Sequence, residues 1–192
     1  MSTITVIGQG NIGKAVEAIA QRGGNTVQFV GHEADATIEG DIVVLAVPYP
    51  ALAEIAGHLG AQLAGKTVVD VTNPLDFNTF DSLVVPADAS AAAELQAQLP
   101  AAKVLKAFNT NFAATLATGK VGSSDQTTTV LIAGDDEAAK AALGEFVTAG
   151  GLNAVDAGSL KRARELEAIG FVQLTLGAGE KIGWDAGFAL VK

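Results

Sequence analysis

The sequence contains no cysteine and few aromatic residues, and both scarcities limit what the protein can be. Without cysteine, disulfide bonds, iron–sulfur clusters and thiolate zinc sites are excluded. Aromatic residues make up 5% of the 192 residues, whereas alanine and glycine are abundant, so we expect an interior of small side chains with helices packed close to a sheet. Charged residues make up 17% and hydrophobic residues 49%, a composition that buries a continuous core.

Positive charge is also scarce: 12 Lys and Arg stand against 21 Asp and Glu, a net charge of −9. This balance argues against nucleic acid or an anionic membrane as a partner. No apolar run is long enough to span a membrane, and the first residues enter a strand pattern without a basic region, so we expect neither a membrane span nor a signal peptide. The two histidines, His32 and His58, are far apart and have no carboxylate at a metal-ligand spacing. The sequence therefore predicts a cytoplasmic protein without a metal site.

Short apolar runs alternate with segments of helical periodicity along the whole chain. Because the strands are apolar throughout, this alternation indicates an α/β fold of the Rossmann type, a doubly wound parallel sheet covered on both faces. We expect a dinucleotide-binding domain over residues 1–158 and a C-terminal helix with a glycine-rich tail, 159–192, packed on it. The predicted strands are 3–7, 26–30, 42–47, 67–71, 103–108, 127–133 and 152–156.

The second predicted connection is unusually short. Only about ten residues separate the strand that ends at Val30 from the one that starts at Ile42, whereas a crossover between parallel strands usually needs a dozen or more. We therefore expect a loop or a single turn there instead of a helix. In sheets of this kind ligands bind beyond the carboxyl ends of the strands, so the informative residues should directly follow each strand.

The strongest motif is the GxGxxG segment formed by Gly8, Gln9, Gly10, Asn11 and Ile12 with the glycine that follows. A strand precedes it and an amphipathic helix follows it, as a dinucleotide-binding turn requires. The first glycine makes the tight turn, the second lets a pyrophosphate approach the backbone, and the third allows close packing of helix on strand. Free N–H groups at the start of the helix would face the phosphates. The alternative is a strand–turn–helix joint without a ligand.

The dinucleotide itself is not decided by the residues. An acidic residue about 20 positions after the glycine turn binds the ribose hydroxyls of NAD, whereas a basic residue there accepts the 2′-phosphate of NADP. The sequence offers Gly31-His32-Glu33 at this place. Glu33 has the offset for NAD, His32 is a weak phosphate partner, and both are equally well explained as solvated loop residues.

Prolines mark the ends of the third and fourth predicted strands, in Val47-Pro48-Tyr49 and in Asn73-Pro74. Proline fixes the backbone and removes a donor, which suits a place where a flat ring slides past, and it also suits an ordinary strand terminus. Asp70 lies inside an apolar run, where an unpaired carboxylate would be costly, so we favour a structural, hydrogen-bonded role for it over a catalytic one. Trp184, in the glycine-rich tail, could equally pack on a ring-shaped ligand or close one end of the core.

Several of these motifs occur together in one known family. The segments GQGNIG, AVPY, DVTNPL, KAFNTNFA and ARELEAIGFVQLTLG, followed by the tail that ends in GFALV, resemble the NADP-dependent coenzyme F420 oxidoreductases. These belong to a wider group that includes the reductase domains of membrane ferric reductases. The resemblance covers nearly the whole chain.

The resemblance implies direct hydride exchange between NADPH and a deazaflavin, coenzyme F420 or another flavin, in a homodimer. By matching positions, Gly8, Gln9, Gly10, Asn11 and Ile12 would hold the pyrophosphate, and His32 would stand where the family places an arginine for the 2′-phosphate. Val47, Pro48 and Asn73 would lie along the nicotinamide, and Asn109, Asn111 and Trp184 near the deazaflavin. The chain departs from the family where Gly31-His32 and a short loop replace a Ser-Arg pair and a helix. We therefore expect at most a modest preference for NADP over NAD.

Two other functions remain as alternatives. One is a dinucleotide sensor or partner subunit that keeps the site and performs no turnover. The other is a dehydrogenase of imines or hydroxy acids, which is disfavoured because such enzymes add a long helical domain and few residues remain after Ser159 to build one. The hydride acceptor, a small molecule, is not identified by the sequence.

Overall fold

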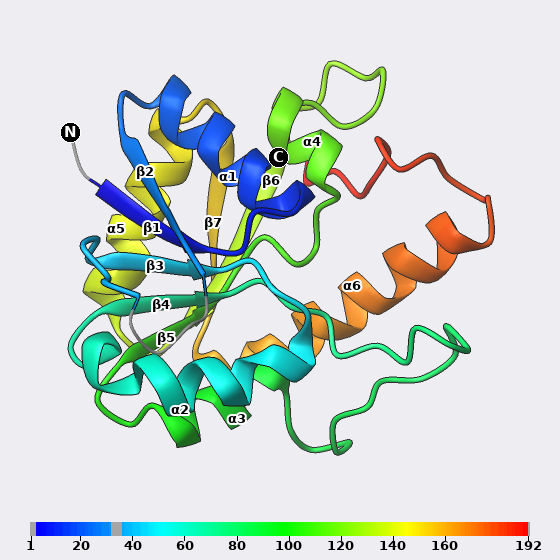
Figure 1. The fold of residues 1–192 in the computed structure, drawn as a ribbon. Helices are drawn as coiled ribbons and strands as arrows, with labels where there is room; N and C mark the ends of the chain where they lie inside the picture. Colours follow the sequence, from blue (N-terminus) through cyan, green and yellow to red (C-terminus); the bar gives the residue numbers. More distant parts are fainter. Residues whose placement is uncertain (1–2, 32–35, 192) are drawn as a thin grey trace.

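A computed structural model describes residues 3–31 and 36–191 and contains one seven-stranded sheet with helices on both of its faces (Figure 1). The order of the strands across the sheet is β2-β1-β3-β4-β5-β6-β7. Because β1 lies between β2 and β3, the chain winds outward in both directions from this point. The strands are β1 (Thr3–Ile7), β2 (Thr26–Val30), β3 (Ile42–Leu45), β4 (Thr67–Asp70), β5 (Lys103–Lys106), β6 (Thr129–Gly134) and β7 (Asn153–Gly158).

The sheet is mostly parallel, with one reversal that the sequence did not predict. The five strands from β2 to β5 are parallel, whereas β6 runs antiparallel to β5, and β7 is again parallel to β6. The reversal follows from the connection between β5 and β6. It contains only the short helix α4, Ala113–Thr118, and a turn, so the chain stays at the carboxyl edge of the sheet and enters β6 from there. Helix α4 was not predicted either.

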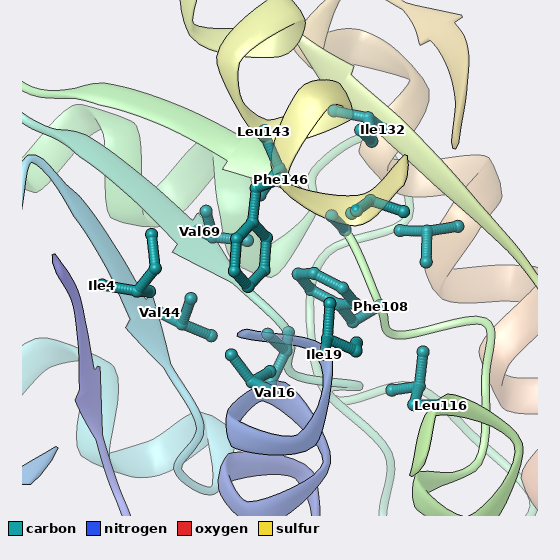
Figure 2. Packing of buried hydrophobic residues seen from close by; sticks show 14 of the residues in the cluster. Ile4, Val16, Ile19, Val44, Val69, Phe108, Leu116, Ile132, Leu143 and Phe146 are labelled. Atoms are coloured by element: carbon teal, nitrogen blue, oxygen red, sulfur yellow. The ribbon is translucent and has the colours of Figure 1, made fainter. Parts of the chain in front are cut away.

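Two hydrophobic clusters hold the helices to the two faces of the sheet. Helices α1 (Asn11–Arg22) and α5 (Glu137–Ala149) cover one face, and Figure 2 shows their side chains meeting those of the strands. Helices α2 (Leu52–Leu63) and α3 (Ala91–Gln98) cover the other. Within the described ranges, no helix has the length and apolar character that crossing a lipid bilayer would need.

Helix α6, Ala163–Ala178, projects from the sheet at the lower right of Figure 1, and the chain then returns along it towards β6. It follows a short 3₁₀ turn, Leu160–Arg162, which packs with α3. The predicted division of the chain at residue 158 stays a prediction.

The short connection between β2 and β3 carries no helix over its described part, residues 36–41, as the sequence predicted. Polar side chains satisfy its backbone instead. The side-chain amide of Gln62 accepts a hydrogen bond from the N–H of Ile38 and donates one to the carbonyl of Ala36, at 3.1 and 2.7 Å. The N–H of Gly40 donates to the hydroxyl of Thr5. A Cβ on Gly40 would lie 2.7 Å from the backbone of β1, so glycine is required where this segment crosses the sheet.

Candidate functional site

The three glycines of the turn after β1 have three different surroundings. Gly8 has φ +106°, and a Cβ on it would lie 2.3 Å from the carbonyl oxygen of Ala46. A Cβ on Gly13 would lie 2.3 Å from the carbonyl oxygen of Gly8, so helix and strand touch there. A Cβ on Gly10 would meet nothing within 4 Å. Only Gly10 therefore borders open space, which is the property expected of the glycine that lets a phosphate approach the backbone.

Helix α1 begins immediately after Gly10 and leaves its first amides available. No side chain caps its N-terminus, and its first turn contains no acidic residue. The first N–H groups of a helix have no partner within the helix and carry a partial positive charge. An anion at this point would therefore be stabilised.

A pocket of about 880 Å³ opens beside this turn, at the carboxyl ends of the strands. Its walls come from the turn after β1, from the residues after β3, β4 and β5, and from α4 and α6. It thus lies where strand order reverses, between β1 and β3, and extends across β4 and β5. The predicted site residues that line it are Gly10, Asn11, Ile12, Val47, Pro48, Asn73, Asn109, Asn111 and Trp184.

Three other predicted residues that the structure describes, Gly8, Gln9 and Gly31, do not line the pocket. Gly8 and Gln9 shape the turn beside it, and Gly31 follows β2 at the same edge of the sheet. His32 lies outside the described residues. The sequence thus identified one continuous pocket, although the role of each residue in it stays a prediction.

Aromatic side chains concentrate in this pocket. The whole sequence has eight Phe, one Tyr and one Trp, and the Tyr, the Trp and three of the Phe line the pocket. Trp184 packs against Phe112 with ring centroids 4.9 Å apart and remains 54% exposed. A Cβ on Gly177 would lie 3.3 Å from this indole, so the glycine in α6 leaves room for the ring. Trp184 packs on Phe112 and lines the pocket, and its contact with a ring-shaped ligand stays a prediction.

Two asparagines join the ends of β4 and β5 at the pocket. The side chain of Asn73 donates to the carbonyl of Asn109, and the side chain of Asn109 donates to Oδ1 of Asn73, both at 2.9 Å. Asn109 also donates to the carbonyl of Leu166 in α6. A Cβ on Gly170 would lie 2.2 Å from Oδ1 of Asn73. Helix α6 therefore packs closely against this pair at Gly170, where there is no room for a side chain. The two asparagines are therefore held from three elements at once.

Four buried oxygen atoms of pocket residues have no hydrogen-bond partner among the described residues. They are Oγ1 of Thr72, Oδ1 of Asn109, Oδ1 of Asn111 and Oε1 of Gln173. An unpaired buried polar atom is energetically costly. The three amide oxygens can only accept hydrogen bonds, so a ligand that fits would present N–H or O–H donors to them. The carboxamide of a nicotinamide ring carries two such N–H groups.

The backbone next to these residues is unusual. Phe108, which is fully buried and lines the pocket, has φ +65°. This left-handed conformation is rare for a large side chain and costs of order 1–3 kcal/mol, so it persists only where its surroundings impose it. Here it turns the chain from β5 into the Asn109 corner.

Asp70, at the end of β4, belongs to a buried charge network. Its Oδ1 accepts the N–H of Thr72, and its Oδ2 lies 2.8 Å from Nζ of Lys106. Nζ of Lys106 also donates to the carbonyl of Thr72 and lies 2.8 Å from Oε1 of Glu167 in α6. Glu167 accepts the N–H of Ala91 at the start of α3. The structural role favoured for Asp70 agrees with these contacts.

Lys106 and Glu167 were not recognised in the sequence, although Lys106 gave a signal. Lys106 is a lysine inside an apolar strand, and such a lysine needs a buried partner. Burial raises the pKa of Glu167, and the ammonium of Lys106 opposes this shift. The network links β4, β5, α3 and α6 and holds the backbone of Thr72, the residue before Asn73.

Tyr49 lines the pocket on the β3 side, and its hydroxyl donates to Oε2 of Glu94 in α3 at 2.6 Å. Burial, followed by the hydrogen bond to Glu94, raises the pKa of Tyr49 to about 12. At neutral pH Tyr49 is therefore an uncharged phenol whose hydroxyl donates its hydrogen bond to Glu94.

These features define the class of the protein: a Rossmann-type α/β protein with a ligand pocket at the switch point of its sheet. The sequence model of the family described as NADP oxidoreductase, coenzyme F420-dependent, matches residues 16–74. The F420-dependent NADP reductase of Methanocaldococcus jannaschii is 34% identical over 161 residues, which are 81% of this chain and 70% of that protein. The chain belongs to the coenzyme F420-dependent NADP oxidoreductase family, and its class is that of NADP-dependent oxidoreductases.

Two further comparisons show likenesses of narrower scope. Metalloreductase STEAP3 of Rattus norvegicus is 40% identical over 111 residues, which are 58% of this chain and only 21% of that protein. A crystal structure from Arthrobacter sp. FB24, described as an F420-dependent NADP-reductase, covers 100% of both chains with a TM-score of 0.86. Its sequence identity is 23%, so this likeness concerns the fold.

Proposed function

We propose that the protein transfers a hydride between NADP(H) and a deazaflavin, a flavin or a similar acceptor. The observation that carries the proposal is the open space at Gly10, beside an uncapped helix start and within the same pocket as the asparagine pair. Family membership supports the chemistry, and the pocket volume of about 880 Å³ suits a large ligand.

The residues of the pocket suit a dinucleotide that lies in one orientation, with its nicotinamide on the β4 and β5 side. The amides at Asn11 and Ile12, at the start of α1, would hold the pyrophosphate. The unpaired oxygens of Thr72, Asn109, Asn111 and Gln173 lie after β4, after β5 and on α6. Those nearest the ring would accept the N–H groups of the carboxamide and so orient it. The adenosine would then extend over the β1 and β2 side, towards Gly31.

NADPH, when held by these residues, would supply a hydride, which is two electrons and one proton, and solvent would supply the further proton that the reduced acceptor needs. The chain's contribution is to hold the two rings face to face and to keep water from between them. The asparagine pair and the buried charge network give this part of the pocket a fixed shape. Tyr49, whose proton is held by Glu94, is not needed for proton transfer.

A homodimer in the cytoplasm is part of the proposal. Apolar side chains of α6 and the tail are between 47% and 73% exposed and lie at or near a second, apolar pocket of about 490 Å³. A second copy of the chain would cover this surface, which monomers rarely expose as a group. Sedimentation equilibrium gives the mass directly, and a monomer at every concentration would refute the dimer. The side chains are Val172, Phe188, Leu190 and Val191.

The variant Gly10→Ala tests the site. Gly10 has φ −72°, which alanine adopts readily, and its Cβ would meet no atom of the chain, so the variant should fold with unchanged thermal stability. The methyl group would occupy the space of the pyrophosphate, so we expect NADPH affinity to fall at least tenfold. Gly57→Ala, on the exposed side of α2, is the matched control and should bind as the parent does. Unchanged affinity of Gly10→Ala would refute this placement of the nucleotide.

Turnover separates the oxidoreductase from a dinucleotide sensor. Steady-state oxidation of NADPH is measured with a panel of deazaflavin, flavin and quinone acceptors. We expect at least one acceptor to be reduced. Tight NADPH binding without turnover of any of them would support the sensor instead.

A further inference from the structure

The loop between β4 and α3 is held in one shape by its own hydrogen bonds. The N–H of Asp76 donates to the carbonyl of Ser82, and the N–H of Phe80 donates back to the carbonyl of Asp76, at 2.9 and 2.8 Å. The carboxylate of Asp76 accepts the N–H of Asn78 and the hydroxyl of Thr79. The bond from the Asn78 N–H is the main cause that lowers the pKa of Asp76. The tip of the loop is therefore held in a defined conformation by these hydrogen bonds.

This loop presents an aromatic ring to the pocket. Phe77 lines the pocket and is 57% exposed. Its ring meets that of Phe80 edge to face, with centroids 5.6 Å apart and an interplanar angle of 88°. Phe80 has φ +53°, a conformation that is costly for a large side chain. The strained backbone at Phe80 belongs to a loop that leaves Phe77 exposed to water. Burial in the core therefore does not explain why this strained conformation is kept.

The position of the loop decides which ligand Phe77 would meet. The loop follows β4, whereas the adenosine side of the pocket lies at β1 and β2, on the far side of β3 in the sheet. The loop begins immediately after Asn73, at the end proposed for the nicotinamide. The ring of Phe77 is therefore placed for a second ligand at the hydride-transfer end.

We propose that Phe77 is a specificity-determining residue, which stacks on the flat ring system of the hydride acceptor. This inference rests on the proposed function. An exposed phenyl ring gains from covering an extended conjugated ring, in proportion to the area covered and with an added preference for offset stacking. Such a contact favours acceptors with three fused rings over acceptors with one.

Steady-state kinetics with acceptors of different ring size test the proposal. The probes are 5-deazariboflavin and riboflavin, each with three fused rings, and p-benzoquinone, with one. For Phe77→Ala we expect KM for both three-ring acceptors to rise about tenfold, and KM for benzoquinone to change less than twofold. Phe77→Tyr, which keeps the ring, should behave as the parent. The dissociation constant of NADPH should not change in either variant.

Val84→Ala is the matched control for the loop. Val84 lies on the same loop, is 53% exposed and does not line the pocket, so its removal should leave every KM unchanged. Unchanged KM values in Phe77→Ala, or equal changes for large and small acceptors, would overturn the inference. So would a rise in the NADPH dissociation constant that parallels the rise in KM.

Direct binding separates failure of the inference from failure of the proposed function. Trp184 is the single tryptophan and lines the pocket, so quenching of its fluorescence reports 5-deazariboflavin binding without turnover. If the parent binds this probe and reduces no acceptor, the proposed function fails, and the affinity difference between parent and Phe77→Ala still tests the inference. If the parent does not bind the probe at all, the inference is overturned.

Discussion

Nζ of Lys106, in β5, lies 2.8 Å from Oε1 of Glu167, in the last helix of the chain. Both side chains are essentially inaccessible to water, and Asp70 completes the network on the other side of the ammonium. Two carboxylates share one ammonium, so the full charge of all three would leave an uncompensated negative charge in the interior. Burial of this kind stabilises a fold only when every partner is in place.

The first prediction concerns Glu167 and the free energy of unfolding. Glu167→Ala removes a partner of Lys106 and leaves the N–H of Ala91 unsatisfied, so we expect a loss of about 3 kcal/mol. Glu167→Gln keeps one acceptor oxygen and leaves the Lys106–Asp70 pair balanced, so we expect a loss of about 1 kcal/mol. Urea denaturation at neutral pH measures both. Equal losses would show that the charge balance is unimportant.

The difference in unfolding free energy between the parent and Glu167→Gln should depend on pH, and the sign of this dependence follows from the pKa of Glu167. Burial raises the pKa of Glu167 in the folded protein, so the folded state binds its proton more tightly than the unfolded state. Its contribution to stability is therefore fully present below the ordinary value of 4.5 and is lost as pH rises through the folded-state pKa. The parent should lose stability relative to Glu167→Gln over this window. If the parent instead gained stability relative to Glu167→Gln as pH rises, the raised pKa of Glu167 would be contradicted.

The second prediction concerns Gly170, where α6 packs closely against the asparagine pair. In Gly170→Ala the new methyl would lie 2.2 Å from Oδ1 of Asn73 and 2.9 Å from the carbonyl oxygen of Asn109. The helix or the asparagine must shift, so we expect a loss of about 2 kcal/mol and a weaker affinity for NADPH. Thermal denaturation and NADPH titration measure the two effects.

A glycine-to-alanine variant on another helix separates the effect of close packing at Gly170 from the general effect of alanine on helix stability. A Cβ on Gly57, in α2, would meet nothing within 4 Å, so Gly57→Ala should raise stability by up to about 1 kcal/mol through helix propensity alone. If both variants are equally stable, the close approach at Gly170 is not a constraint.

The fold was largely predictable because strand and helix periodicities are local properties. The predicted strands 3–7 and 26–30 coincide with β1 and β2, and the other strands agree to within one or two residues at most ends. Strand direction is a different matter. Nothing in the residues of β6 distinguishes an antiparallel neighbour from a parallel one, because both are apolar runs between turns. Direction depends on the edge of the sheet to which the connection returns, and the helix α4 in that connection is too short to give a clear period.

The site was predictable where the backbone dictates the residue and less so where side chains meet from distant segments. Glycines and strand ends follow a pattern that places them at one edge of the sheet, so Gly10, Asn73 and Asn109 were found. Glu167 lies on a helix whose packing partner is unknown until the chain is folded. Phe77 lies in a segment without periodicity, and only its hydrogen-bonded loop explains why an exposed phenylalanine borders the pocket.

The third prediction concerns nucleotide choice at His32, which lies outside the described residues. The family resemblance places an arginine at this position, and a neutral imidazole replaces a permanent cation. We expect the parent to prefer NADPH over NADH by less than about tenfold, and His32→Arg to raise NADPH affinity about tenfold without changing NADH affinity. Side-by-side titrations measure this. Equal gains for both nucleotides would show that the 2′-phosphate does not lie near this position.

The fourth prediction concerns Tyr49 and the absence of a proton-transfer group. Its pKa of about 12 and its hydrogen bond to Glu94 keep it neutral, so Tyr49→Phe should leave the pH profile of kcat unchanged between about pH 6 and about pH 9. The lost hydrogen bond should cost about 1 kcal/mol of stability.

The stability difference between parent and Tyr49→Phe has its own pH dependence. The pKa of Tyr49 is raised in the folded protein, so its contribution should be constant below the ordinary value of 10.0 and decline as pH rises towards about 12. Denaturation at a series of alkaline pH values measures the decline. A loss of kcat in Tyr49→Phe at neutral pH, with NADPH affinity unchanged, would instead make the phenol part of the chemistry. It would then contradict the conclusion that positioning of the two rings suffices.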